Sequence, residues 1–556
     1  MILLRFAVIM AFISNFMFAA ERPNIIVFLI DDQDLAECGP FAKPGTLYTP
    51  NFDRLAKEGM KFTQAYVPHT VCTPSRYAFL TGRYAGNSYS KEYLAAAPTG
   101  QQGFIDFNMC LETDNMNVGR VLSDAGYVTG FVGKFHVGPD LDQQPFATEL
   151  NTKLKRMNLK SGPEADAIFQ KYELILSQLI QQRGFTWADH VMHANLNDPY
   201  AVHNPDWMAE AALKFIAQNK AKPFYLHYCP TLLHGPDNSW RKDMDHPDIT
   251  GAGQVKPDPV WLKRRQDVLE KTKALGMTDD HQVGIAWIDS NLGVLLDQLD
   301  ALGLTQNTLI VFAPDHGSTL KSSLYARDSC QIPMLMRWPA GIAAGSTCAE
   351  LVQSIDLAPT WFELAKAKVP EGYHLDGRDL TPLFKTGTTD QWRDSLYFEI
   401  DNLRAVMTKD WRYIATRYTK DRLEMIHQAK PQELPKLMSP YMLRGATHPG
   451  FFDEDQLYDL RQDPDEMKNL AASPEFSAQL KTMKSKLKEY LEKQDRPFGE
   501  FIEGGNAVPG GQIDAQVAVV KQLEIKGKTI IVPAHLNGGK EGVFNAKETK
   551  TKGGKE

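Results

Sequence analysis

The feature that most restricts the fold of this chain is a set of five short, almost continuously apolar segments. They lie at residues 24–30, 127–133, 224–229, 308–313 and 333–338. Amphipathic helical patterns separate them: one is opened by Asp206 and runs to about residue 216, and a longer one covers 283–299 and ends near Gly303. Continuous apolar strands alternating with helices predict an α/β fold, in which helices cover both faces of a large, mostly parallel sheet.

The sequence pattern changes near residue 386. Short, partly alternating segments at 397–400, 404–407 and 411–415 predict a small antiparallel sheet. A lysine- and glutamate-rich helix is predicted at 473–492, and a further strand at 529–533. The Lys- and Gly-rich chain from about residue 546 is predicted to be disordered. We therefore divide the chain into a large N-terminal domain (22–385), a C-terminal subdomain (386–500) and an extension (501–556).

The N-terminus is typical of an export signal. Arg5 precedes an apolar stretch at 6–18 that is too short to span a bilayer, and Ala19-Ala20 follow it. We predict a signal peptide at 1–20 and a secreted or periplasmic protein without stable membrane insertion; a buried N-terminal helix is the alternative. The net charge of −7 argues against nucleic acid as a partner. The six cysteines lack CxxC spacing, which disfavours a structural zinc site.

Four of the predicted strands lead into charged or ionisable side chains. These are Asp31 and Asp32 after the first strand, Lys134 and His136 after the second, His234 after the third, and Asp315 and His316 after the fourth. The carboxyl ends of parallel strands share one sheet edge, where ligands bind. One Asp-Asp or Asp-His-Gly after a strand is usually a turn or a helix cap, but four such strand ends favour a site. Three carboxylates there would repel one another, and a divalent cation relieves that repulsion.

A further candidate is the segment Cys72-Thr-Pro-Ser-Arg76, which Leu80-Thr-Gly-Arg83 follows. Pro74 suits the first turn of a helix, which places Cys72 at or beside the N-cap. The free N–H groups and the helix dipole at that position favour an anion. Arg76 lies one turn further into the helix, where it can brace oxygen atoms on residue 72. Considered alone, Cys72 could also be a low-pKa thiolate or a small buried apolar residue.

With these motifs, residues 22 to about 495 resemble the formylglycine-dependent (type I) sulfatases of the alkaline phosphatase-like superfamily. In that family the Cys-x-Pro-Ser-Arg core with Leu-Thr-Gly-Arg is the signal at which a maturation enzyme oxidises the cysteine to formylglycine. Further matching segments occur in the family's order at 51–56, 126–134 and 456–465. The resemblance implies a sulfuric ester hydrolase that a formylglycine-generating enzyme matures at Cys72.

The resemblance also implies a role for each residue of the predicted site. The metal ligands would be Asp31, Asp32, Asp315, His316 and formylglycine-72. Arg76 and Lys134 would hold the hydrated aldehyde, His136 would be its acid/base partner, and His234 and Lys321 would contact the sulfate. Lys321 is assigned because Tyr325 follows it at the familiar offset, although the segment up to Pro333 is one residue longer than usual.

The cation that the resemblance implies is Ca²⁺, with Mg²⁺ as the alternative. Many members have Asn where this chain has His316, and a histidine occurs in the iduronate-sulfatase-like branch. Imidazole nitrogen is a poorer ligand for calcium than an amide oxygen, so His316 weakens the case for calcium over another divalent ion.

The implied mechanism begins with hydration of the aldehyde to a diol, one hydroxyl of which attacks sulfur. The metal, Lys134, His234 and Lys321 would spread the charge of the sulfuryl oxygens. His234 or Lys321 would protonate the leaving oxygen, and His136 would take the proton of the second hydroxyl so that sulfate is expelled.

Substrate selection is predicted to lie in the insertion at about 139–205, which carries aromatic and polar side chains suited to sugar hydroxyls and sulfates. They are Arg183, Trp187, Asp189, His190, His193 and His203. We predict Arg183, Asp189, His190 and His203 as substrate-binding residues; the alternative is that they only pack or cap the insertion. The expected substrate is a sulfated polysaccharide or oligosaccharide. The alternatives are an aryl or choline sulfatase, a phosphoester or phosphonate hydrolase of the same superfamily, and a non-catalytic sulfated-glycan-binding protein.

Overall fold

The computed structural model describes most of the chain. The described residues are 22–138, 161–195, 200–235, 240–277, 279–418, 448–450, 453–494, 496–505, 523–525 and 528–530. The signal peptide predicted at 1–20 and the disorder predicted from about residue 546 lie outside them. Within these ranges the structure contains no helix that combines the length and the apolar character needed to cross a membrane.

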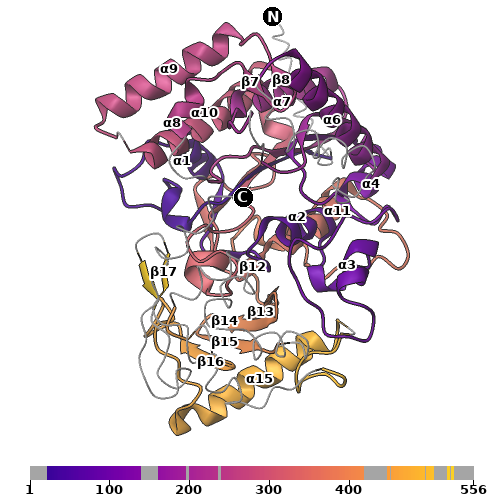
Figure 1. Ribbon diagram of the computed structural model, residues 1–556, viewed down its shortest axis with the longest axis vertical. Helices are drawn as coiled ribbons and strands as arrows, with labels where there is room; N and C mark the ends of the chain where they lie inside the picture. Colours follow the sequence, from indigo (N-terminus) through magenta and orange to yellow (C-terminus); the bar gives the residue numbers. More distant parts are fainter. Residues whose placement is uncertain are drawn as a thin grey trace, which may run out of the picture.

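An eight-stranded sheet forms the centre of the larger part of the molecule (Figure 1). Its strands are β1 (Asn24–Ile30), β2 (Met60–Phe62), β4 (Val128–Lys134), β5 (Trp187–Met192), β6 (Phe224–Cys229), β9 (Thr308–Pro314), β10 (Met334–Arg337) and β11 (Ser346–Cys348). They are ordered β11-β2-β10-β9-β1-β6-β4-β5, and only β10 runs antiparallel to its neighbours. The mostly parallel sheet is confirmed, and each of the five predicted strands agrees within one residue at either end.

Both faces of this sheet are buried, which explains the continuously apolar strands. In β1 the odd-numbered residues Ile25, Val27 and Leu29 belong to one hydrophobic core, and the even-numbered residues from Ile26 onward belong to the other. The first core includes side chains of α2 (Cys72–Thr81), α3 (Lys91–Ala96), α4 (Val118–Asp124), α6 (Pro163–Gln182) and α11 (Leu357–Ala365). The second includes side chains of α1 (Pro50–Glu58), α7 (Pro205–Asn219), α8 (Trp240–Met244), α9 (Pro259–Ala274) and α10 (Asp280–Ala301). Full burial of each such side chain contributes roughly 1.5–3 kcal/mol.

The start of α7 differs from the prediction. The helix begins at Pro205, and Asn204 is the N-cap because its side-chain oxygen accepts the N–H of Trp207 at 3.2 Å. Asp206, which was predicted to begin the helix, lies inside its first turn and is buried. Its carboxylate pairs with Arg264 and Arg265, each at 2.8 Å. A buried ion pair between α7 and α9 therefore replaces the expected cap.

The C-terminal part contains the predicted small antiparallel sheet with one additional strand (Figure 1). Its strands are β13 (Ser395–Ile400), β14 (Leu403–Thr408), β15 (Trp411–Thr416) and β16 (Asp455–Asp459). The apolar residues Met483, Leu487 and Leu491 of α15 (Ser477–Leu491) pack on this sheet. The same core includes Ala78 of α2, which joins the sheet to the larger part. The division at 385/386 and the boundary at 500 remain predictions.

Shorter elements complete the structure. Three further strand pairs are β3 (Ala65–Tyr66) with β12 (Val352–Gln353), β7 (Ile249–Thr250) with β8 (Gly253–Gln254), and β17 (Leu523–Ile525) with β18 (Lys528–Ile530). Single helical turns occur at Leu35–Glu37, Ala85–Asn87, Thr305–Asn307, Ala326–Cys330, Ser354–Asp356, Thr381–Leu383 and Pro474–Phe476. The strand predicted at 529–533 overlaps β18, and its last three residues lie outside the described ranges.

Candidate active site

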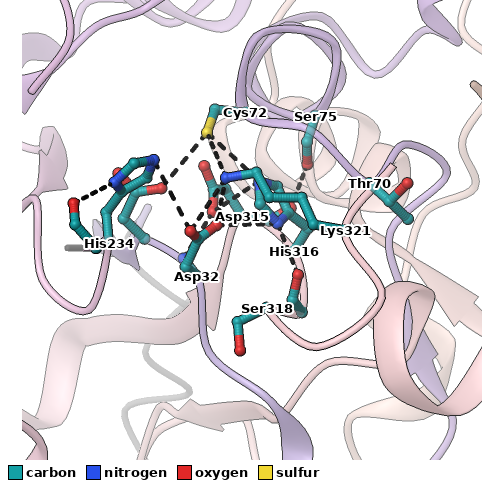
Figure 2. Close-up of polar contacts among 12 residues, drawn as sticks. Asp32, Thr70, Cys72, Ser75, His234, Asp315, His316, Ser318 and Lys321 are labelled. Carbon is teal, nitrogen blue, oxygen red and sulfur yellow. Dashed lines mark hydrogen bonds and ion pairs between the residues drawn. The ribbon is translucent and has the colours of Figure 1, made fainter. Parts of the chain in front are cut away.

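The four strand ends that carry ionisable residues meet at one edge of the sheet. Strands β9, β1, β6 and β4 are consecutive neighbours and parallel, so their carboxyl ends point the same way. The side chains after β1 and β9, together with His234 from the loop after β6, gather around the start of α2 (Figure 2). This edge therefore brings together all the residues predicted as metal ligands or catalytic groups.

Cys72 is the first residue of α2 and is buried. Its Sγ atom lies 3.6 Å from the Nζ atoms of both Lys134 and Lys321, and 3.4 Å from Nε2 of His316. Although burial opposes ionisation, the two ammonium groups and His316 hold the pKa of the Cys72 thiol well below its usual range. The Sγ atom thus occupies a position where negative charge is strongly stabilised.

Arg76 links the helix to the carboxylates. Its Nε donates to Oδ2 of Asp315 at 3.0 Å, one terminal nitrogen donates to the carbonyl of Lys134 at 2.9 Å, and the other lies 3.6 Å from Asp31. The Ser75 hydroxyl donates to the Asp315 carbonyl from the same turn. These contacts orient the carboxylates and the Lys134 backbone around residue 72.

Each of the first two carboxylates faces a buried lysine. Lys134 Nζ lies 2.6 Å from Asp31, and Lys321 Nζ lies 2.9 and 3.0 Å from the two oxygens of Asp32. Burial acts to raise the pKa of Asp31, but Lys134 holds it below its usual range. Burial and the nearby Asp31 charge raise the pKa of Asp315 to about 7. The cluster is therefore an assembly of alternating charges with little access to water.

The donor atoms fit a divalent cation. Asp31, Asp32, Cys72 and His316 each offer one ligand atom, and these four atoms lie within 4.8 Å of one another. Asp315 adjoins this group, because its Oδ1 accepts the Asp32 N–H at 3.2 Å and lies 3.7 Å from His316 Nε2. Carboxylate oxygens with one imidazole suit several divalent ions and do not select calcium.

The two remaining catalytic candidates are histidines with opposite pKa shifts. His136 bonds to Cys72, and burial followed by the charge of Lys134 lowers its pKa to about 4. His234 lies with Nε2 3.8 Å from Asp32, and 23% of its side chain is exposed. Burial acts to lower its pKa, but the charges of Asp31 and Asp32 and the bond to residue 72 together outweigh burial, so the pKa is raised. His136 is therefore suited to accept a proton and His234 to carry one.

The substrate-binding residues predicted in the insertion do not form one cluster. Arg183 donates to the carbonyls of residues 111 and 179, and Asp189 pairs with His190 and with Lys214 of α7. His203 lies beside His234 and bonds to the Thr231 hydroxyl at 2.8 Å. Of these four, His203 is thus the one in contact with a catalytic candidate, His234. The substrate-binding roles of all four remain predictions.

Two further residues lie at this edge: Asp34, which sequence reasoning missed, and His193, which it named only among the side chains of the insertion. The Asp34 carboxylate accepts the backbone N–H groups of Ser318 and Thr319 at 2.6 and 3.2 Å, which fastens the loop between His316 and Lys321. His193 follows β5 directly, and its carbonyl accepts the N–H of His136 at 2.8 Å. The strand-end argument would have found His193 had β5 been predicted. No local pattern marks Asp34, because its partners are far along the chain.

Comparison with known proteins decides the family. Residues 23–367 match the family model described as sulfatase, and residues 315–443 match the model for the C-terminal part of N-sulphoglucosamine sulphohydrolase. The chain belongs to the sulfatase family. As a sulfatase it is a sulfuric ester hydrolase, and the formylglycine nucleophile and bound metal are typical of its family. The likeness of the Asp315-His316 pair to the iduronate-sulfatase-like branch remains a prediction.

Individual relatives are distant but cover most of the sulfatase. The ulvan-active sulfatase of Formosa agariphila is 26% identical, with 84% of this chain and 79% of the relative aligned. Arylsulfatase A of Homo sapiens is 28% identical, with 84% and 87% aligned. The solved structure of the PsFucS1 sulfatase from Pseudoalteromonas sp. superposes with a TM-score of 0.53 at 18% identity, covering 85% of this chain and 91% of that one. This last likeness confirms the fold.

Proposed function

We propose that this sulfatase removes sulfate from a sulfated saccharide, using residue 72 as a formylglycine made from cysteine. We further propose one divalent cation, calcium or magnesium, held by Asp31, Asp32, Asp315 and His316. The observation that carries this proposal is the placement of Cys72: a buried first residue of a helix, within 3.6 Å of two lysine ammonium groups.

The cationic side chains around residue 72 would bind and stabilise the transferring sulfuryl group. Lys134 and Lys321 stand on either side of the nucleophile position, and the start of α2 adds its free N–H groups. A unit charge pair at 4 Å is worth about 4 kcal/mol at an effective dielectric constant of 20. When bound, the cation would add Lewis-acid stabilisation of the sulfate oxygens and lower the pKa of a hydroxyl on residue 72.

The two histidines would move the protons. His136, with a pKa of about 4, is neutral near pH 7 and bonds to residue 72, so it can take a proton from a hydroxyl there. His234 has a raised pKa and partial exposure, so it can hold a proton at Nε2 for the leaving oxygen. A formylglycine hydrate has a second hydroxyl, and transfer of its proton to His136 expels the sulfate. Serine and cysteine have no second hydroxyl.

The surroundings of the site support a saccharide as the substrate. A pocket of about 620 Å³ adjoins α2, within the range of small-ligand sites, and mixes aromatic and polar side chains. The ulvan-active relative favours a sulfated saccharide, whereas arylsulfatase A favours the aryl alternative. We also propose export to the periplasm or outside the cell, with prior maturation by a formylglycine-generating enzyme.

The proposal is tested with protein co-expressed with a formylglycine-generating enzyme. Mass spectrometry reads the chemical state of residue 72, and initial rates are compared on defined sulfated oligosaccharides, 4-nitrophenyl sulfate, choline sulfate and matched phosphate esters. We expect formylglycine at residue 72, the highest kcat/KM on a sulfated saccharide, and no hydrolysis by Cys72→Ala. Full turnover by protein with an ordinary thiol at residue 72 would refute the nucleophile. A higher kcat/KM on aryl, choline or phosphate esters would refute the substrate class.

A further inference from the structure

The pocket beside α2 lies next to the nucleophile. Its wall includes Thr73, which follows Cys72 in α2, and His136, which bonds to Cys72. Other lining residues come from α3 and from the segment between α3 and α4, neither of which supplies a residue to the charged cluster. A sulfate ester attacked at residue 72 can therefore place its leaving group in this pocket.

The pocket offers an aromatic surface. Phe107 lines it with 39% of the residue exposed, although a side chain of this size is usually buried. Its ring centroid lies 5.6 Å from that of His136. Because Phe107 is held beside the catalytic histidine and still presents part of its ring, it offers an apolar face to the C–H groups of a sugar ring.

Two polar groups in the pocket wall have hydrogen-bonding capacity left. The Glu92 carboxylate lies beside the Cys110 thiol, whose proton goes to the Gly138 carbonyl at 3.0 Å, and a carboxylate has about four acceptor positions. The Nδ1 atom of His193 is buried and has no hydrogen-bond partner among the described residues. An unmatched buried polar atom is costly, and a ligand hydroxyl would satisfy it. Glu92 can only accept hydrogen bonds, so it selects a ligand with hydroxyl donors.

We propose that this pocket is the leaving-group subsite and that Phe107, Glu92 and His193 together recognise a hydroxylated sugar ring. The inference deepens the proposed function and rests on it. It assigns substrate selection to α3 and to residues 107 and 193, in place of the predicted residues Arg183, Asp189 and His190, whose side chains are engaged elsewhere.

The test compares variants of the matured enzyme on two substrates. Glu92→Gln keeps the shape but weakens the charge-assisted acceptor, so kcat/KM on the preferred sulfated saccharide should fall about tenfold or more. On 4-nitrophenyl sulfate, which has no hydroxyl to donate, kcat/KM of the same variant should change less than about threefold. Phe107→Ala should raise KM for the saccharide about tenfold and leave kcat nearly unchanged. Matched controls are Glu371→Gln and Leu262→Ala, both at exposed positions outside the pocket.

The outcomes separate the subsite from the function. Selective loss on the saccharide supports both proposals. If the wild type cleaves saccharides and both variants do so equally well, the subsite is wrong and the function stands. Equal losses on both substrates would also overturn the subsite, because they indicate an effect on chemistry or folding. A wild type that cleaves only the aryl ester would overturn the proposed function, and with it the role of the pocket in recognising a sugar ring.

Discussion

Replacing Lys321 with glutamine tests the charge arrangement of the site most directly. The lysine is buried, its Nζ atom lies 3.6 Å from Sγ of residue 72, and it pairs with Asp32 at 2.9 Å. Burial opposes its charge, but Asp32 and residue 72 hold its pKa above the usual range, so it is a cation near pH 7. Glutamine is shorter, keeps hydrogen-bond donors and removes the charge.

The expected loss follows from the distance. At about 4 Å and an effective dielectric constant of 20, a full charge pair contributes about 4 kcal/mol. The sulfate ester already carries part of that charge in the ground state, so only the increase in the transition state changes kcat. We therefore expect kcat to fall by about 10²–10³, the range found when a preorganised donor to a developing oxyanion is removed. KM should also rise, because the ground-state anion loses a partner.

The assay must separate catalysis from maturation and folding. Initial rates on the preferred substrate are divided by the formylglycine content from mass spectrometry, and thermal unfolding checks that the fold is retained. Lys481→Gln, at an exposed position of α15, is the matched control. Lys321→Arg should recover part of kcat because it restores the charge. A Lys321→Gln enzyme with normal formylglycine content and kcat within about threefold of wild type would refute the electrostatic argument.

Three further outcomes are expected. Cys72→Ser should release at most one equivalent of the desulfated alcohol per enzyme and then stop with the sulfate bound to the serine, because serine lacks the second hydroxyl that expels sulfate; continuous release of sulfate seen in a rapid-quench experiment would contradict this. Chelation should abolish activity and lower Tm, and adding back Ca²⁺ or Mg²⁺ should restore both. At a cation concentration one hundred times Kd, the restored free energy of unfolding should be about 2.7 kcal/mol. Unchanged activity with no metal detected by elemental analysis would rule out the cation. Burial lowers the pKa of His227 to about 3, below the unfolded value near 6.5, so protons favour the unfolded chain and stability is lost as pH falls below 6.5. Between pH 8 and 5 this loss is about 2 kcal/mol, and denaturant unfolding of His227→Gln should lack it.

Local sequence pattern was enough to predict part of the fold and of the site. Apolar strands of continuous rather than alternating character predicted a sheet buried on both faces, and β1 and β6 agree with the prediction residue for residue. Ionisable residues directly after strands predicted a shared edge, and the Cys72 segment predicted the start of a helix. These inferences hold because backbone hydrogen bonding and side-chain periodicity act over a few residues.

The tertiary structure decided which of those residues meet, and with which partners. Asp206 was expected to open a helix but is ion-paired with Arg265, 59 positions away, and Asp34 fastens a loop 284 positions away. The reversed direction of β10 and the pocket between α3 and the end of β5 have no local signal either. A carboxylate that can serve as a cap, an ion-pair partner or a metal ligand takes the role that its packed neighbours leave open, because burial penalises any charge without a partner.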